Sequence, residues 1–218
     1  MSEGPRITLD VADRIVARLR ERWSLHPDWV VVVGSVRRRR PEVGDIELIA
    51  PAVSPNAQDS LYERIAATID NPPAPTSIFG EERPVAADAF ATAERGLKPG
   101  FLACSLVVRA WGGKCTVPVQ IYRYTPQNLG WMMIERTGPA NFGRWFLMKW
   151  KHAHGIPVGD GRFKASIDNH LVNLDQKPVP VETEEIAFRR ANMQWIPPEH
   201  RDVFIARAEA ASKARRIA

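Results

Sequence analysis

The sequence has few cysteines and no long apolar run. Only two of its 218 residues are cysteine, Cys104 and Cys115. A tight turn at the glycine pair between them would not place them opposite one another, so we expect no structural disulfide. No apolar stretch approaches the roughly 20 residues that a membrane-spanning helix needs. Charges interrupt the N-terminal segment, which therefore does not resemble a secretion signal. We expect an intracellular protein without a membrane partner, which is cytoplasmic or nucleoid-associated. A virus-encoded protein remains an alternative.

The sequence also lacks a strong charge of either sign. Thirty Lys and Arg residues stand against 25 Asp and Glu, which gives a formal net charge of +5. This mild excess favours polyanionic partners but identifies none. The hydrophobic fraction is 44%, which is ordinary for a globular protein with a sizeable core. The 18 prolines predict short elements joined by many turns.

The apolar pattern predicts short helices and strands in alternation. Val11, Ile15 and Leu19 recur at four-residue intervals and indicate an amphipathic helix over residues 10–23. The remaining expectations, in chain order, are strands at 29–33 and 45–50, a helix at 60–69, a proline-rich surface loop at 71–77, a hairpin from 101–110 and 115–124, a strand at 131–135, a helix from 141 to the break at 154–155, and helices at 184–192 and 201–218.

Residues 30–50 carry the clearest chemical pattern. A buried strand ends at Gly34-Ser35, and a later strand carries Asp45 and Glu47. Residues two apart on a strand face the same side, so the two carboxylates would project together. A glycine turn with a serine hydroxyl lets a phosphate approach closely, and Mg²⁺ commonly bridges carboxylates to substrate phosphates. The pattern therefore predicts a metal-dependent phosphate site, with an edge strand of solvated charges as the alternative interpretation.

Three separated motifs resemble the DNA polymerase beta-like, or family X, nucleotidyltransferases. Residues 34–47 (GSVRRRRPEVGDIE) match the family's palm motif, in which G-S and two arginines precede G-D-x-D. Residues 118–138 resemble the family's strand with the third carboxylate, followed by a strand that ends in Thr-Gly. Residues 181–201 resemble its C-terminal signature, an acidic pair before a short helix and a Pro-Pro-x-x-Arg turn. The motifs keep the family's order and cover most of residues 6–201.

The resemblance implies an α+β fold with two parts. Residues 1–124 would form a nucleotidyltransferase palm, a mixed sheet flanked by helices. Residues 125–218 would form a small α/β thumb subdomain. A cis peptide would follow Gly138, and proline at position 139 lowers the cost of that geometry.

The resemblance also implies roles for individual residues. Asp45 and Glu47 would bind Mg²⁺ or Mn²⁺ and, with Gln120, form the catalytic set. The triphosphate would be held by a second set, Gly34, Ser35, Arg38, Arg6 and Gly138. The partners would be a DNA primer-template and deoxynucleoside triphosphates, bound by a monomer.

One departure from the family bears directly on catalysis. Gln120 occupies the position of the third carboxylate and offers a neutral amide where a negative charge is expected. Because that carboxylate serves mainly the catalytic metal, its loss would spare the nucleotide-bound metal. We therefore expect a DNA polymerase-like nucleotidyltransferase in gap filling or repair. A catalytically impaired member that binds nucleotide or DNA is the alternative, and a transferase acting on RNA, protein or a small molecule is a third.

Overall fold

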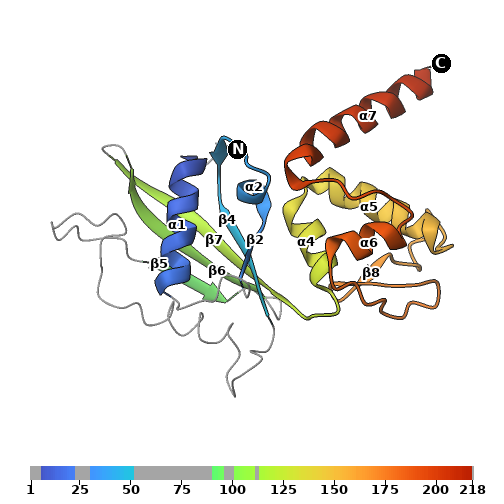
Figure 1. The fold of residues 1–218 in the computed structure, drawn as a ribbon, viewed down its shortest axis with the longest axis horizontal. Coiled ribbons are helices and arrows are strands. Elements are labelled where there is room, and N and C mark those ends of the chain that lie inside the picture. Colours follow the sequence, from blue (N-terminus) through green and yellow to red (C-terminus); the bar gives the residue numbers. More distant parts are fainter. Residues whose placement is uncertain (1–5, 23–29, 52–89, 96–100, 111–112, 218) are drawn as a thin grey trace. The chain divides into compact units, whose positions relative to one another are not determined.

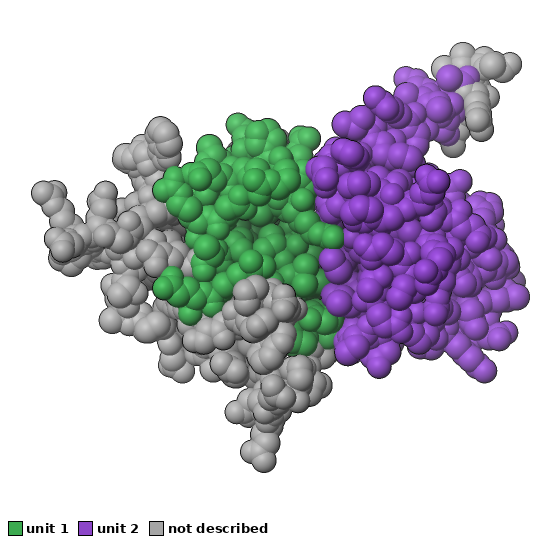
Figure 2. Space-filling view, in the orientation of Figure 1, with its two compact units in different colours: residues 1–124 green, residues 125–218 purple. Residues whose placement is uncertain are grey.

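The computed structural model describes residues 6–22, 30–51, 90–95, 101–110 and 113–217. They form an α+β structure, and the chain divides into two compact units, Met1–Tyr124 and Thr125–Ala218 (Figures 1 and 2). The division falls at the residue where the sequence analysis places the boundary. The helix expected at 60–69 and the loop expected at 71–77 lie outside the described residues. No helix in the described part of the chain has both the length and the apolar character needed to cross a bilayer.

Unit 1 is built on a mixed five-stranded sheet. Its strands, in spatial order, are β2 (Val31–Val32), β4 (Ile46–Pro51), β7 (Gly113–Tyr124), β6 (Phe101–Ala110) and β5 (Phe90–Arg95). The β4–β7 pair is parallel and the other pairs are antiparallel. The expected hairpin is therefore present as β6 and β7. Its register places Cys104 opposite Val119 and Cys115 opposite Val108, so the cysteines are not opposed.

One face of this sheet packs against helix α1 (Leu9–Arg22), which crosses the strands in Figure 1. Apolar side chains of the helix, such as Ile15 and Leu19, join Ile46, Leu48 and Ile121 of the sheet in one buried cluster. A short second sheet pairs β1 (Ile7–Thr8) with β3 (Glu42–Val43). Because side chains alternate along a strand, burying Ile46 and Leu48 sends Glu47 to the opposite face.

Unit 2 is mainly helical. Its elements are α4 (Leu129–Thr137), α5 (Ala140–Ala153), β8 (Ser166–Ile167), β9 (His170–Leu171), α6 (Glu184–Arg190), a 3₁₀ turn (Pro198–His200) and α7 (Arg201–Ile217). Its core is rich in aromatic rings, with Trp131, Phe142, Phe146 and Trp150 all fully or almost fully buried.

The strand expected over residues 131–135 is wrong, because this segment is the middle of helix α4. A short apolar run fits a buried strand and a buried helix equally well. Packing decides in favour of the helix, since α4 lies against α6 and the backbone N–H of Gly130 donates to the carbonyl of Val181 at 2.8 Å. A Cβ at Gly130 would collide with the carbonyl of Thr183.

Candidate functional site

The turn after β2 brings Gly34 against the candidate carboxylates. The backbone N–H of Val33 donates to the carbonyl of Glu47 at 2.9 Å, and the chain then turns at Gly34 into the short helix α2 (Gly34–Arg37). Gly34 has a positive φ of 67° and is buried. A Cβ there would collide with Oε2 of Glu47. Only glycine permits this backbone conformation together with so close a carboxylate.

Glu47 lies on the sheet face opposite the α1 core, and Asp45 lies two residues before it, just ahead of β4. Glu47 is half-buried inside β4, and Asp45 is half-buried just before that strand. Burial raises the pKa of Asp45 above its ordinary value, and the positive charge of Arg38 opposes that rise. Burial is the larger effect, so ionisation of Asp45 is less favourable than that of an exposed aspartate.

Gln120 is brought to the same place by the parallel β4–β7 pair. Glu47 and Gln120 are direct partners in the register, and paired residues on adjacent strands project from the same face. The sheet therefore gathers positions 45, 47 and 120, although they are far apart in the sequence. The side chain at position 120 is a neutral amide, whereas those at positions 45 and 47 are carboxylates.

Tyr122 contacts Gln120, and the sequence pattern did not predict this contact. Its hydroxyl donates to Oε1 of Gln120 at 2.6 Å. The signal for it was present, because Tyr122 is two residues beyond Gln120 and so shares its face of the strand. Which atoms meet depends on the side-chain conformations, and the alternation alone does not give these.

Ser35 and Arg38 belong to the α2 turn, which packs against β4, and Arg6 precedes β1. The Oγ of Ser35 is buried and has no hydrogen-bond partner among the residues that the structure describes. Arg38 ends the α2 turn, where its backbone N–H donates to the carbonyl of Gly34 at 3.2 Å. Arg6 precedes β1, and the pairing of Ile7 with Val43 brings its backbone beside the segment that leads to Asp45. Of the three residues, Arg38 is the one whose charge acts on Asp45.

Gly138 belongs to unit 2, whereas the other candidate residues belong to unit 1. It ends helix α4, where its backbone N–H donates to the carbonyl of Ile134 at 3.1 Å. A Cβ at Gly138 would lie 2.8 Å from Cδ1 of Phe142, so close packing within unit 2 already requires glycine there.

The expected cis peptide between Gly138 and Pro139 is wrong, since no peptide bond in the described segments is cis. Pro139 is the N-cap residue of α5, and its carbonyl accepts from the N–H groups of Phe142 and Gly143. The trans form is the intrinsically favoured isomer of an X–Pro bond.

The donor set fits one divalent cation better than two. Mg²⁺ is usually held by one or two carboxylates together with substrate phosphates, and Asp45 and Glu47 supply two carboxylates that are two residues apart. Among the described residues, no cluster of three or more His, Cys, Asp or Glu side chains could hold a metal ion. A further cation would lack an anionic ligand at position 120.

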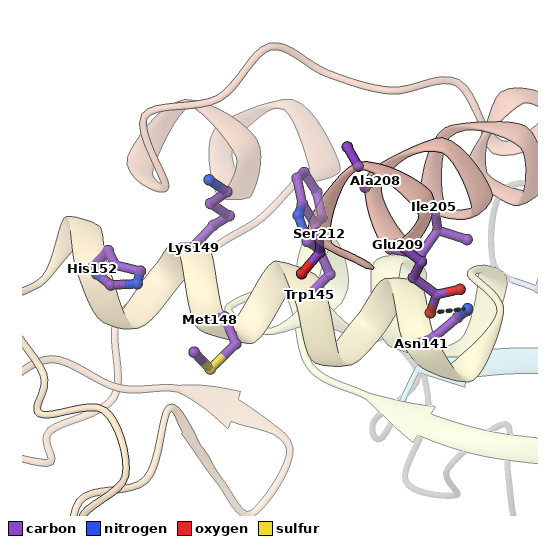
Figure 3. Close-up of a pocket in the computed structure, with 10 residues that line it drawn as sticks. Asn141, Trp145, Met148, Lys149, His152, Ile205, Ala208, Glu209 and Ser212 are labelled. Atoms are coloured by element: carbon purple, nitrogen blue, oxygen red, sulfur yellow. Dashed lines mark hydrogen bonds between the residues drawn. The ribbon is translucent and has the colours of Figure 1, made fainter. Parts of the chain in front are cut away.

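A groove of about 530 Å³ lies elsewhere, between α5 and α7 (Figure 3). Trp145, Met148 and Ile205 contribute much of its apolar lining, and none of the candidate site residues borders it. At one end Nδ2 of Asn141 donates to Oε1 of Glu209 at 2.8 Å. This hydrogen bond links the two helices, so we assign the groove to the packing of unit 2 and not to the candidate site.

The candidate site is thus a half-buried face of unit 1 where the Gly34 turn, two carboxylates and the Gln120–Tyr122 pair converge. Comparison of the chain with protein-family models and with curated proteins finds no match in either case.

Proposed function

We propose that the protein is a nucleotidyltransferase of the DNA polymerase beta-like type, which binds a deoxynucleoside triphosphate with a divalent cation and adds the nucleotide to a DNA 3′-hydroxyl. One observation carries the proposal. The buried Gly34 turn lies directly against the Glu47 carboxylate, and Asp45 precedes Glu47 by two residues, a spacing that would direct both carboxylates to one side. A glycine turn next to paired carboxylates is the arrangement that a cation-bound triphosphate requires.

The reaction joins the 3′-oxygen of the primer to the α-phosphorus and breaks the bond to the bridging oxygen, so that pyrophosphate leaves and the 3′-hydroxyl loses its proton. Mg²⁺ or Mn²⁺ would neutralise the triphosphate and assist ionisation of the 3′-hydroxyl. Asp45 and Glu47 would hold the cation. The Ser35 hydroxyl would donate to a phosphate oxygen, and Arg38, with Arg6, would offset the phosphate charge.

Gln120 favours a second candidate function, binding of nucleotide or DNA without turnover. An amide is neutral and cannot accept the proton of the 3′-hydroxyl as a carboxylate can. In addition, the Gln120 Oε1 atom already accepts a hydrogen bond from Tyr122. The same palm would then serve as a sensor or as a component of an assembly.

The first test is calorimetric titration of the protein with a deoxynucleoside triphosphate in the presence of Mg²⁺. Asp45→Ala should abolish binding, because it removes half of the carboxylate pair. Glu42→Ala is the matched control, since Glu42 is an exposed carboxylate three residues upstream in β3, and it should leave the affinity unchanged. Equal affinity for the wild type and Asp45→Ala would remove the metal site and the proposal together.

The second test separates the two candidate functions. Primer extension on a substrate with a one-nucleotide gap is measured with Mg²⁺ and with Mn²⁺, beside the binding titration. Turnover that Asp45→Ala abolishes supports the transferase. Binding without turnover under both metals supports the non-catalytic function and rules out the transferase on this substrate.

A further inference from the structure

The Gln120–Tyr122 hydrogen bond determines what Gln120 can offer to a ligand. An amide side chain has one oxygen acceptor and two N–H donors. The phenol hydroxyl of Tyr122 donates to that oxygen at 2.6 Å, a short distance for such a bond. The oxygen is the only atom of the side chain that could bind a cation. The hydrogen bond occupies one of the two lone pairs of that oxygen and holds the amide with its oxygen end toward Tyr122, so that the two Nε2 donors are directed the other way.

The register gives this contact a defined place in the site. Glu47 is paired with Gln120, and Ile49 is paired with Tyr122. Gln120 and Tyr122 therefore lie on the face that carries the candidate cation ligand Glu47, and both are partly buried. Partial burial strengthens the hydrogen bond relative to one in water. A donor fixed beside a cation-bound triphosphate would face anionic oxygen.

We propose that Tyr122 is a positioning residue that holds Gln120 as a hydrogen-bond donor to the bound triphosphate, so that the site takes one divalent cation per nucleotide. This proposal rests on the proposed function, because it assumes that Asp45 and Glu47 bind a metal-nucleotide complex. It goes further by giving the number of cations and by assigning a role to a residue outside the predicted set.

The experiment counts Mn²⁺ by electron paramagnetic resonance in the presence of a saturating, non-hydrolysable deoxynucleoside triphosphate analogue. The wild type should bind one Mn²⁺ per nucleotide. Gln120→Glu, which has the same length and adds a negative charge, should bind two. Two Mn²⁺ per nucleotide in the wild type, or one in Gln120→Glu, would overturn the proposed link between the amide and the cation count.

Tyr122→Phe tests the positioning role. Loss of the hydroxyl frees the amide to rotate, so affinity for the triphosphate analogue should fall about tenfold, the size of effect that outer-shell partners commonly have. The affinity for Mn²⁺ measured without nucleotide should stay unchanged, because Asp45 and Glu47 are intact. A general disturbance of the sheet would lower both affinities, and unchanged nucleotide affinity would show that the hydroxyl does not position Gln120.

Tyr124→Phe is the matched control, because Tyr124 lies two residues further along the same strand. It should bind the analogue as the wild type does, and a tenfold loss there as well would contradict a specific role for Tyr122. Failure of the underlying function is recognised separately. In that case the wild type binds no metal-nucleotide complex, or binds one that Asp45→Ala leaves intact.

Discussion

Gly34 is the residue at which the backbone conformation and the candidate site depend on each other most directly. Its φ of 67° lies in the left-handed region, which side chains with a Cβ enter at a cost of about 1–2 kcal/mol. The same missing Cβ leaves room for the Glu47 carboxylate. Glycine is thus required at this position for two reasons, the backbone conformation of the turn and the nearby Glu47 carboxylate.

Gly34→Ala should therefore destabilise the protein by about 1–2 kcal/mol and also lower metal-nucleotide affinity by at least about tenfold, because Glu47 must move. Chemical denaturation and calorimetric titration measure the two effects. Gly44→Ala is the control, since a Cβ there would meet no atom within 4 Å. If Gly34→Ala lost stability but bound normally, the carboxylate would be shown not to depend on the turn.

At the scale of elements, the C-terminal signature forms a buried network in unit 2. Glu184 begins α6 and Arg201 begins α7, and their side chains form an ion pair at 2.8 Å with exposed fractions of 2% and 0%. Arg201 Nε also donates to the carbonyl of Ile196, and Trp195 Nε1 donates to Glu184. The C-terminal signature therefore has a structural role, because its buried ion pair and hydrogen bonds join α6 to α7.

Glu184→Gln should cost about 3–5 kcal/mol of unfolding free energy, because it leaves the Arg201 charge buried without its counter-ion. Its neighbour Glu185 is exposed, so Glu185→Gln should change stability by less than about 0.5 kcal/mol. Urea denaturation of the two variants makes the comparison with the same chemical change. Equal stabilities of the two variants would contradict a specific structural role for Glu184.

His154 gives unit 2 a pH-sensitive helix end. It follows α5, and its ring stacks on Trp150 with centroids 4.0 Å apart. Burial lowers its pKa below the ordinary 6.5; the charge of Arg190 lowers it further, and a hydrogen bond with the Arg190 backbone acts in the opposite direction. The unfolded chain therefore binds a proton at a higher pH than the folded one does.

It follows that His154 contributes stability above about pH 6.5 and that this contribution is lost as the pH falls through the lowered pKa of the folded state. His154→Phe keeps an aromatic ring on Trp150 and removes the titration. The wild type should thus lose more thermal stability than His154→Phe when the pH is lowered from neutral to about 5. Parallel melting curves at both ends of that range would expose the prediction as wrong.

Across the whole molecule, the sequence predicted best those elements whose pattern has a single interpretation. The helical period of α1 and the apolar run of β4 each have a single interpretation. The glycine pair where β6 meets β7 indicates their hairpin. The apolar pattern of residues 131–135 fits either a strand or a helix. The strand prediction failed because packing against α6, which is distant in the sequence, decides between the two.

The candidate site divides in the same way. Alternation along β4 was sufficient to predict Glu47 on the face opposite Ile46 and Leu48, which lie in the core. The Gln120–Tyr122 hydrogen bond was not predicted, because it depends on side-chain conformations. The pairing of Glu47 with Gln120 depends on the strand order of the sheet, which no local pattern contains.

The parallel pairing of β4 with β7 also has a consequence for folding kinetics. The partners Glu47 and Gln120 are 73 positions apart in the chain, whereas only two residues, 111 and 112, separate β6 from β7. Local contacts form early and distant ones late, since closing a long loop costs entropy before the strands gain any pairing energy. The hairpin should therefore precede the β4–β7 contact during refolding. The candidate carboxylate–amide pair would be among the last features of unit 1 to assemble, and recovery of ligand binding would report its completion.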